Sequence, residues 1–164
     1  MQQNIWPDEI KILAIDDHQD VLNLIRMSLE PAGFRLIRAS KAQEGLTLAM
    51  REEPDLLLLD LMMPELDGLE LLRRLRRHSK LEKMPVIVIS ARVGTADQQR
   101  VLQVSDVVYN SVDAYMGKPF APGQLLQTVK DVLLKHRDYI LEKREPQNKP
   151  WEQQYHLEMT DHLR

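Results

Sequence analysis

The chain contains no cysteine and no long apolar run. Without thiols it can form neither disulfide bonds nor metal sites with thiolate ligands. Its apolar stretches fall far short of the roughly 18 residues that a membrane-spanning helix requires. The first ten residues contain polar groups, Pro7 and acids, where a secretory signal peptide would have an apolar core. These absences predict a cytoplasmic protein without a membrane segment.

The chain also lacks an excess of positive charge. It has 22 Lys and Arg against 25 Asp and Glu, for a net charge of -3, so it has no broad basic field of the kind that nucleic-acid binders carry. One basic run, over 73–80, falls late in a predicted helix, where cations oppose the negative end of the helix dipole. We interpret this run as a solvated helix end and expect no direct binding to nucleic acid.

The length of 164 residues suits one domain with an appendage, and an apolar share of 43% is enough for a core. We expect a domain over 10–140, preceded by an extension over 1–9. Residues 141–164 are expected to form a polar linker followed by a short amphipathic helix. Apolar residues recur every fourth position in that last part, at Trp151, Tyr155, Met159 and Leu163.

Short apolar runs alternate with helical periodicity along the domain. Strands are predicted at 11–15, 34–39, 55–59, 85–89 and 114–116, and helices at 21–29, 40–51, 66–75, 96–109 and 125–140. Ser40 is a plausible N-cap for the second helix. This order predicts an α/β fold, a doubly wound five-stranded parallel sheet with helices on both faces.

The third predicted strand holds four leucines between Asp55 and Asp60. Such a run is typical of a strand buried on both faces, as in a parallel sheet covered by helices. Asp60 then stands at the carboxyl end of the strand, where open α/β sheets bind their ligands. Its position therefore favours a role in binding or reaction over that of a solvated surface acid.

Functional groups follow three other strands as well. Asp16 and Asp17 follow the first, Ser90 the fourth and Lys118 the fifth. Each could alone be an ordinary turn or cap residue, but their occurrence at four strand ends that share one edge favours a site. Crowded carboxylates repel one another, and a hard divalent cation such as Mg²⁺ removes that penalty.

The remaining groups of this set suit a phosphoryl group. Lys118 supplies a compact positive charge and Ser90 a hydroxyl, both directed to anionic oxygens in such chemistry. A carboxylate between them can act as a nucleophile and form an aspartyl-phosphate.

In these motifs the sequence resembles the receiver domain of two-component response regulators, over about residues 10 to 136. The matching elements are Ile15-Asp16-Asp17, Leu59-Asp60-Leu61-Met62-Met63-Pro64 with Asp67-Gly68, Ser90-Ala91, and Tyr115 followed by Lys118-Pro119-Phe120. The resemblance implies a flavodoxin-like (βα)5 fold. It also implies a signalling module that assists its own phosphorylation and dephosphorylation and is not a conventional enzyme.

The resemblance implies that Asp60 accepts a phosphoryl group from a histidine kinase or a histidine phosphotransfer protein. Asp17, Asp60 and the backbone carbonyl of Met62 would bind Mg²⁺ or Mn²⁺, and Asp16 would support that metal site through water. Lys118 would contact the phosphoryl oxygens.

It further implies that Ser90 and Tyr115 form a switch pair, in which the hydroxyl moves toward the phosphoryl group and the ring turns inward. The switch would change a surface formed by the last two helices, through which a homodimer could form and an output partner could bind. An ordinary half-buried strand tyrosine is the alternative interpretation of Tyr115.

The sequence departs from the receiver pattern between Ser90 and Lys118, where the segment is longer than usual, with the excess at 105–110. Ser111 also stands where receivers usually have glycine. We hypothesise an extended fourth helix in which Val107, Val108 and Tyr109 form a partner patch. A lengthened loop packed on its own domain is an equally open alternative.

Two other functions are alternatives to the phosphoacceptor. A Mg²⁺-dependent phosphatase with an aspartyl nucleophile usually has a second acid two residues later, where this chain has Met62. A degenerate receiver that binds partners without phosphorylation would not need the complete set of site residues. The Met1 start favours a stand-alone receiver over part of a longer regulator.

Overall fold

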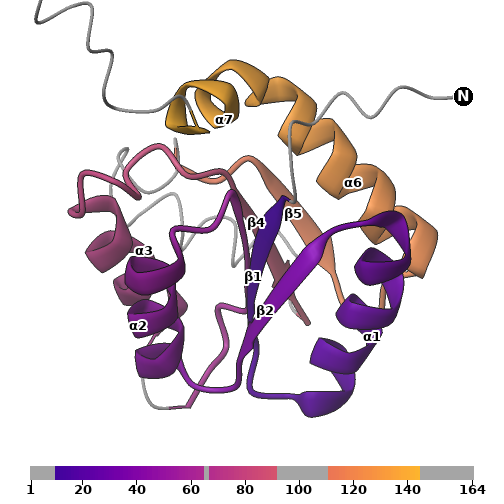
Figure 1. Ribbon diagram of the computed structural model, residues 1–164. Coiled ribbons are helices and arrows are strands. Elements are labelled where there is room, and N and C mark those ends of the chain that lie inside the picture. Colours follow the sequence, from indigo (N-terminus) through magenta and orange to yellow (C-terminus); the bar gives the residue numbers. More distant parts are fainter. Residues whose placement is uncertain (1–9, 65–66, 92–110, 145–164) are drawn as a thin grey trace, which may run out of the picture.

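Five parallel strands form one sheet in the computed structural model of the chain, which describes residues 10–64, 67–91 and 111–144 (Figure 1). The strands are β1 (Lys11–Ile15), β2 (Arg35–Ala39), β3 (Leu56–Leu59), β4 (Val86–Ser90) and β5 (Ala114–Gly117). Their order is β2-β1-β3-β4-β5, and every neighbouring pair is parallel. The predicted fold class is confirmed, and each strand lies within about a residue of its predicted range.

Helices cover both faces of the sheet. Helices α1 (Gln19–Leu29) and α6 (Pro122–Lys135) pack on one face, and α2 (Ala42–Glu52) and α3 (Gly68–Arg76) on the other (Figure 1). Successive residues of a strand point to opposite faces, so Leu56 and Leu58 join one apolar cluster and Leu57 and Leu59 the other. All four leucines are at most 1% exposed. This double burial explains why β3 has no polar residue within it.

The sheet order reverses direction at β1. Strand β1 pairs with β2 on one side and with β3 on the other. In doubly wound sheets a crevice opens at such a reversal, outside the carboxyl ends of the two central strands. The fold therefore places the residues that follow β1 and β3 beside a natural binding position.

The start of α2 differs from the sequence prediction. Its N-cap is Lys41 rather than Ser40, and Lys41 makes no side-chain capping bond. The Ser40 backbone N–H instead donates to the Glu44 carboxylate, at 3.3 Å. The Glu44 carboxylate thus accepts from the residue before the N-cap, one position earlier than the N-cap N–H that a capping box uses.

The predicted closing helix over 125–140 is wrong in one respect, because it is two helices. Helix α6 ends at Lys135 and α7 (Arg137–Arg144) follows after His136. The His136 imidazole Nε2 lies 2.5 Å from the Asp113 carboxylate Oδ1, a contact that fixes the break against the segment before β5. Ile140 is fully buried, as its place in the apolar stripe predicted.

The predicted polar linker is also wrong at its beginning, since 141–144 belong to α7. The last turn of α7 is held at the amino end of β3, where Arg144 Nη2 lies 2.7 Å from the Asp55 carboxylate. Lys143 Nζ donates to the Pro54 carbonyl at 2.8 Å. These contacts order four residues that look like a linker in the sequence.

Several sequence predictions fall outside the described residues. They are the extension over 1–9, the helix over 96–109 with its proposed patch at 107–109, and the amphipathic helix near the end of the chain. Within the described residues, no helix has the length and apolar character needed to cross a membrane.

Candidate functional site

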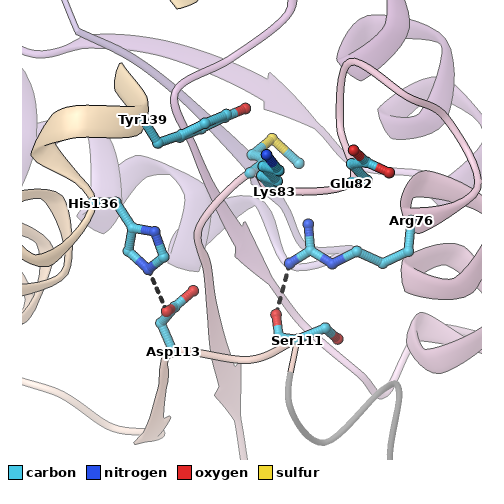
Figure 2. A pocket seen from close by; sticks show the side chains of 8 residues that line it. Arg76, Glu82, Lys83, Ser111, Asp113, His136 and Tyr139 are labelled. Atoms are coloured by element: carbon cyan, nitrogen blue, oxygen red, sulfur yellow. Dashed lines mark hydrogen bonds and ion pairs between the residues drawn. The ribbon is translucent and has the colours of Figure 1, made fainter. Parts of the chain in front are cut away.

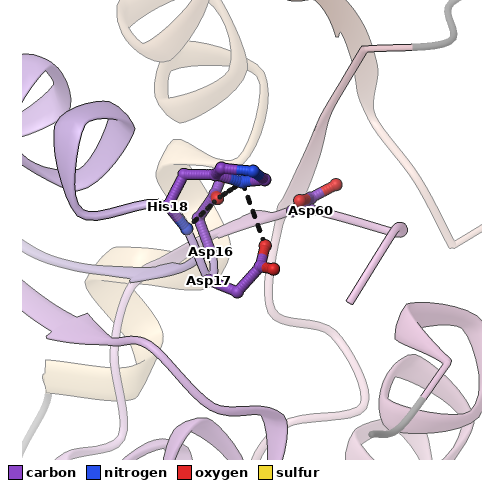
Figure 3. A group of neighbouring side chains, drawn as sticks. All are labelled: Asp16, Asp17, His18 and Asp60. Carbon is purple, nitrogen blue, oxygen red and sulfur yellow. Dashed lines mark hydrogen bonds and ion pairs between the residues drawn. The ribbon is translucent and has the colours of Figure 1, made fainter. Parts of the chain in front are cut away.

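The carboxyl ends of β1 and β3 bring two buried acids together. Asp16 and Asp60 are each 2% exposed. Backbone bonds hold them in place, because the Asp60 N–H donates to the Ile15 carbonyl at 3.0 Å and the Asp16 N–H to the Ala39 carbonyl at 3.1 Å. Figure 3 shows Asp60 beside Asp16, with Asp17 and His18 continuing from the end of β1. The strand ends thus converge as the sequence predicted.

Lys118 connects the two buried acids. Its ammonium Nζ lies 2.6 Å from Asp16 Oδ2 and 3.2 Å from Asp60 Oδ2. The Lys118 backbone N–H donates to the Ser90 carbonyl at 2.9 Å, which fixes it next to the end of β4. One ammonium therefore serves two buried carboxylates, and a buried charge without a partner costs several kcal/mol.

The loop after β3 completes the environment of Asp60. The Met62 backbone N–H donates to Asp60 Oδ1 at 2.9 Å. Met62 itself is 44% exposed, so it lies at the protein surface. A metal bond from the Met62 carbonyl stays a prediction.

Gly68 allows this loop to fold closely against the start of α3. A Cβ atom added at Gly68 would stand 2.7 Å from Leu61 Cα and 2.8 Å from the Asp60 carbonyl oxygen. Both contacts are with backbone atoms that cannot rotate away. The glycine is therefore needed for the position of the loop that carries Asp60.

The sequence reasoning missed His18. Its Nδ1 lies 3.1 Å from Oδ1 of Asp16 and 3.1 Å from Oδ1 of Asp17, and its backbone N–H donates to Asp16 Oδ1 at 2.9 Å. His18 is the N-cap of α1 and makes no side-chain capping bond. Its position directly after an Asp pair was the one signal in the sequence that could have identified it.

The arrangement can hold a divalent cation. One ligand atom from each of Asp16, Asp17, His18 and Asp60 lies within 4.8 Å of the others. The Asp17 Oδ1 atom is buried and makes no hydrogen bond of good geometry, and its contact with His18 Nδ1 at 3.1 Å is an ion pair only when the imidazole is protonated. A bound cation would compensate its charge. A set rich in carboxylate oxygens fits the ligand preference of Mg²⁺ and Mn²⁺.

The predicted switch residues occupy adjoining strands. Ser90 ends β4 and is 4% exposed. Tyr115 in β5 stands opposite Val88 and packs against the apolar cluster under α2 and α3. Their movement as a pair stays a prediction.

Comparison with known proteins agrees with this geometry. The family model of the response regulator receiver domain matches residues 12–130 of the sequence. The alkaline phosphatase synthesis transcriptional regulatory protein PhoP of Bacillus subtilis is 35% identical over 123 residues, covering 75% of this chain and 48% of PhoP. The transcriptional regulatory protein SrrA of Staphylococcus aureus is 31% identical over 151 residues, covering 92% of this chain and 59% of SrrA. The chain thus spans about half the length of the curated relatives it matches.

A solved structure shows the same likeness in three dimensions. The chemotaxis protein CheY4 of Vibrio cholerae superposes with a TM-score of 0.69 at 25% identity, covering 77% of this chain and all of CheY4. Because the receiver model matches well over half of the sequence, this chain belongs to the response regulator receiver domain family.

Proposed function

We propose that this receiver accepts a phosphoryl group on Asp60 from the phosphohistidine of a histidine kinase or a histidine phosphotransfer protein. The observation that carries the proposal is the position of the Asp60 carboxylate. It is buried at a sheet crevice, contacts the Lys118 ammonium and lies beside the Asp16 and Asp17 carboxylates. Phosphorylation on aspartate is general in the family, and Asp60 is the acid of this set at the end of the central strand.

The transfer requires a nucleophile and charge compensation. An Asp60 carboxylate oxygen would form a bond to phosphorus while the P–N bond to the donor imidazole breaks and its electron pair stays on nitrogen. Lys118, already beside Asp60, would contact the phosphoryl oxygens. A Mg²⁺ ion held by Asp17 and Asp60, with support from Asp16, would supply positive charge for the phosphoryl oxygens.

The consequence of phosphorylation would be a change in the partner surface, with Ser90 and Tyr115 as the switch pair. Ser90 ends β4 and its carbonyl accepts the backbone N–H of Lys118, whose ammonium contacts Asp60, and this proximity supports the role. We place the chain in the cytoplasm with the kinase. A homodimer through the last two helices is part of the same proposal.

The output partner of the switch is not defined by the chemistry at Asp60. The relatives PhoP and SrrA are named as transcriptional regulatory proteins, so the expectation of no direct binding to nucleic acid is not supported by the comparisons. We propose a role in controlling an output partner, in this or another chain.

The proposal is tested by incubating the protein with acetyl phosphate and Mg²⁺ and measuring intact mass. Wild type should gain one phosphoryl adduct, and Asp60→Asn should gain none. Asp17→Asn should lower the rate at a given Mg²⁺ concentration, since it removes a metal ligand. Asp20→Asn, which changes an exposed acid nearby in α1, is the matched control and should react like wild type.

The possible results separate the functions. An adduct that persists in folded Asp60→Asn would contradict the assignment of the phosphoacceptor. Absence of an adduct on folded wild type would favour the degenerate receiver. Rapid, repeated turnover of a phosphate ester would favour the phosphatase, although Met62 supplies no second acid.

A further inference from the structure

A second cavity opens at the opposite end of the sheet from Asp60. It has a volume of about 570 Å³ and lies between the end of α3, the turn before β4, the segment before β5 and the junction of α6 with α7. Figure 2 shows its side chains, with Arg76 facing His136 and Tyr139 across the space. The receiver chemistry at the carboxyl ends of the strands does not use any of these residues.

Arg76 is the unusual charge in this cavity. The sequence predicted that the basic run of α3 is solvated, and this is wrong for Arg76, which is half-buried. Its Nη1 donates to the Leu81 carbonyl at 2.8 Å and its Nη2 to the Ser111 carbonyl at 2.6 Å. Both acceptors are neutral. The Arg76 Nε atom is buried and has no hydrogen-bond partner in the described structure.

The nearest acids do not neutralise this guanidinium. Asp113 uses Oδ1 for His136 at 2.5 Å and Oδ2 for the Val86 backbone N–H at 2.9 Å. Glu82 lines the cavity as an exposed side chain, and no carboxylate of the described residues forms an ion pair with Arg76. Burial lowers the pKa of Arg76, and Asp113 opposes that shift from a distance. The guanidinium thus bears a desolvation cost without a direct counter-charge.

Tyr139 adds a second unsatisfied group on the other side of the cavity. Its hydroxyl is buried and has no hydrogen-bond partner in the described structure. Burial raises the pKa of Tyr139, with Asp55 acting in the same direction, so the hydroxyl keeps its proton and can donate. His136, bound to Asp113 through Nε2, lies on the same side of the cavity as Tyr139 (Figure 2). Buried polar groups are nearly always satisfied in folded proteins, and both groups here need an acceptor.

We propose that this cavity binds a small anion with a carboxylate or phosphate group, held by the Arg76 guanidinium and the Tyr139 hydroxyl. Lys83 at the rim adds a further positive charge. A volume of about 570 Å³ suits a metabolite-sized ligand rather than a peptide. An oxyanion supplies several acceptor atoms at once, and a guanidinium matches carboxylate and phosphate geometry.

The test is an NMR titration of the whole chain in EDTA, with inorganic phosphate in one arm and citrate in the other. EDTA prevents a metal ion from recruiting the probe to the Asp60 site. We expect saturating shifts of the Arg76 Nε–Hε signal and of the backbone amides of Ser111 and Tyr139. The arm that saturates at lower concentration identifies phosphate or carboxylate as the preferred group.

Three variants locate the binding. Arg76→Gln should weaken binding about ten-fold or more, and Tyr139→Phe by about three-fold or more, as expected for charged and neutral hydrogen bonds. Arg77→Gln removes the same charge from an exposed neighbour and should leave the affinity unchanged. Tyr139→Phe keeps the test decisive if Arg76→Gln does not fold.

Three results would overturn the proposal. The first is the absence of saturable shifts with either probe on folded wild type. The second is equal weakening by Arg77→Gln, which would indicate a general charge effect. The third is binding that Tyr139→Phe leaves unchanged or whose shifts gather around Lys118.

Discussion

Asp55→Asn tests whether the last turn of α7 is an integral part of the fold. Asp55 is 2% exposed, and its Oδ2 atom accepts the Lys11 backbone N–H at 2.8 Å and Arg144 Nη2 at 2.7 Å. Its Oδ1 atom lies 3.4 Å from Lys143 Nζ. Asparagine has almost the same shape and keeps an acceptor for Lys11, but it removes the charge that two cations face.

The expected loss is about 2–3 kcal/mol in the free energy of unfolding. Removing one partner of a fully buried ion pair costs about 3–5 kcal/mol. The side chains of Lys143 and Arg144 are 17% and 22% exposed, so water solvates part of their charge and lowers this cost. For a chain of this size, the change corresponds to a fall in Tm of about 6–10 °C.

Urea unfolding followed by circular dichroism measures the loss. Asp131→Asn, an exposed acid on α6, is the control and should change stability by less than about 0.5 kcal/mol. The double variant with Arg144→Met should lose clearly less than the sum of the single losses, because the two changes remove the same interaction. A loss under about 1 kcal/mol for Asp55→Asn, or full additivity, would refute the reasoning.

Asp55→Asn should also change how the free energy of unfolding depends on pH. Burial lowers the pKa of Lys143 below 10.5, and Asp55 opposes that shift. Between the lowered folded pKa and the unfolded value, the unfolded chain binds the proton more tightly, so Lys143 makes stability rise with pH there. Without Asp55 the folded pKa falls further and the rise begins at lower pH. A Lys143 pKa unchanged in an NMR titration of Asp55→Asn would contradict this account.

Two further predictions concern the site loop and the surface. Gly68→Ala should destabilise the fold by about 1–3 kcal/mol through overpacking, and it should also lower the rate at which Asp60 is phosphorylated. Gly123→Ala is the control, because open space surrounds Gly123. It should be neutral or stabilising in the unfolding assay and should leave the phosphorylation rate in the mass assay unchanged. Lys80→Gln should raise the pKa of Glu53 toward 4.5, because the Lys80 hydrogen bond is the main cause of its lowering. NMR titration of the carboxyl carbon measures this, and an unchanged Glu53 pKa would contradict the assignment.

The fold was predictable because its signals are local and repeated. The four leucines of β3 are apolar at every position, which is how a strand buried on both faces differs from a half-exposed one. Alternation of such runs with helical periodicity leaves few topologies, since parallel crossovers are right-handed. The acids at the strand ends were found by the same logic, because Asp16 and Asp60 meet wherever the carboxyl ends of β1 and β3 meet.

The features that the sequence did not predict depend on distant partners. The apolar stripe from Leu125 to Ile140 continues without interruption, so periodicity does not predict the break at His136, whose imidazole contacts Asp113 from a distant segment. Arg76 lies within a run of exposed cations, and the Ser111 carbonyl that binds it is 35 residues away. Periodicity reports which face a residue occupies on its own helix, and it carries no information about such partners.

The two ends of β3 show how charge balance separates a structural acid from a chemical one. Asp55 and Asp60 are equally buried and only four leucines separate them. At Asp55, two cations and a backbone N–H serve one carboxylate. At Asp60, one ammonium is shared with Asp16, and the nearby Asp17 Oδ1 contacts His18 Nδ1, which carries a charge only when it is protonated. The Asp60 end therefore has negative charge in excess, and a cation that binds there would be stabilised by it. A further cation at Asp55, which already faces Lys143 and Arg144, would not. This difference supports the proposal that a metal ion binds at the Asp60 end, whereas Asp55 anchors α7.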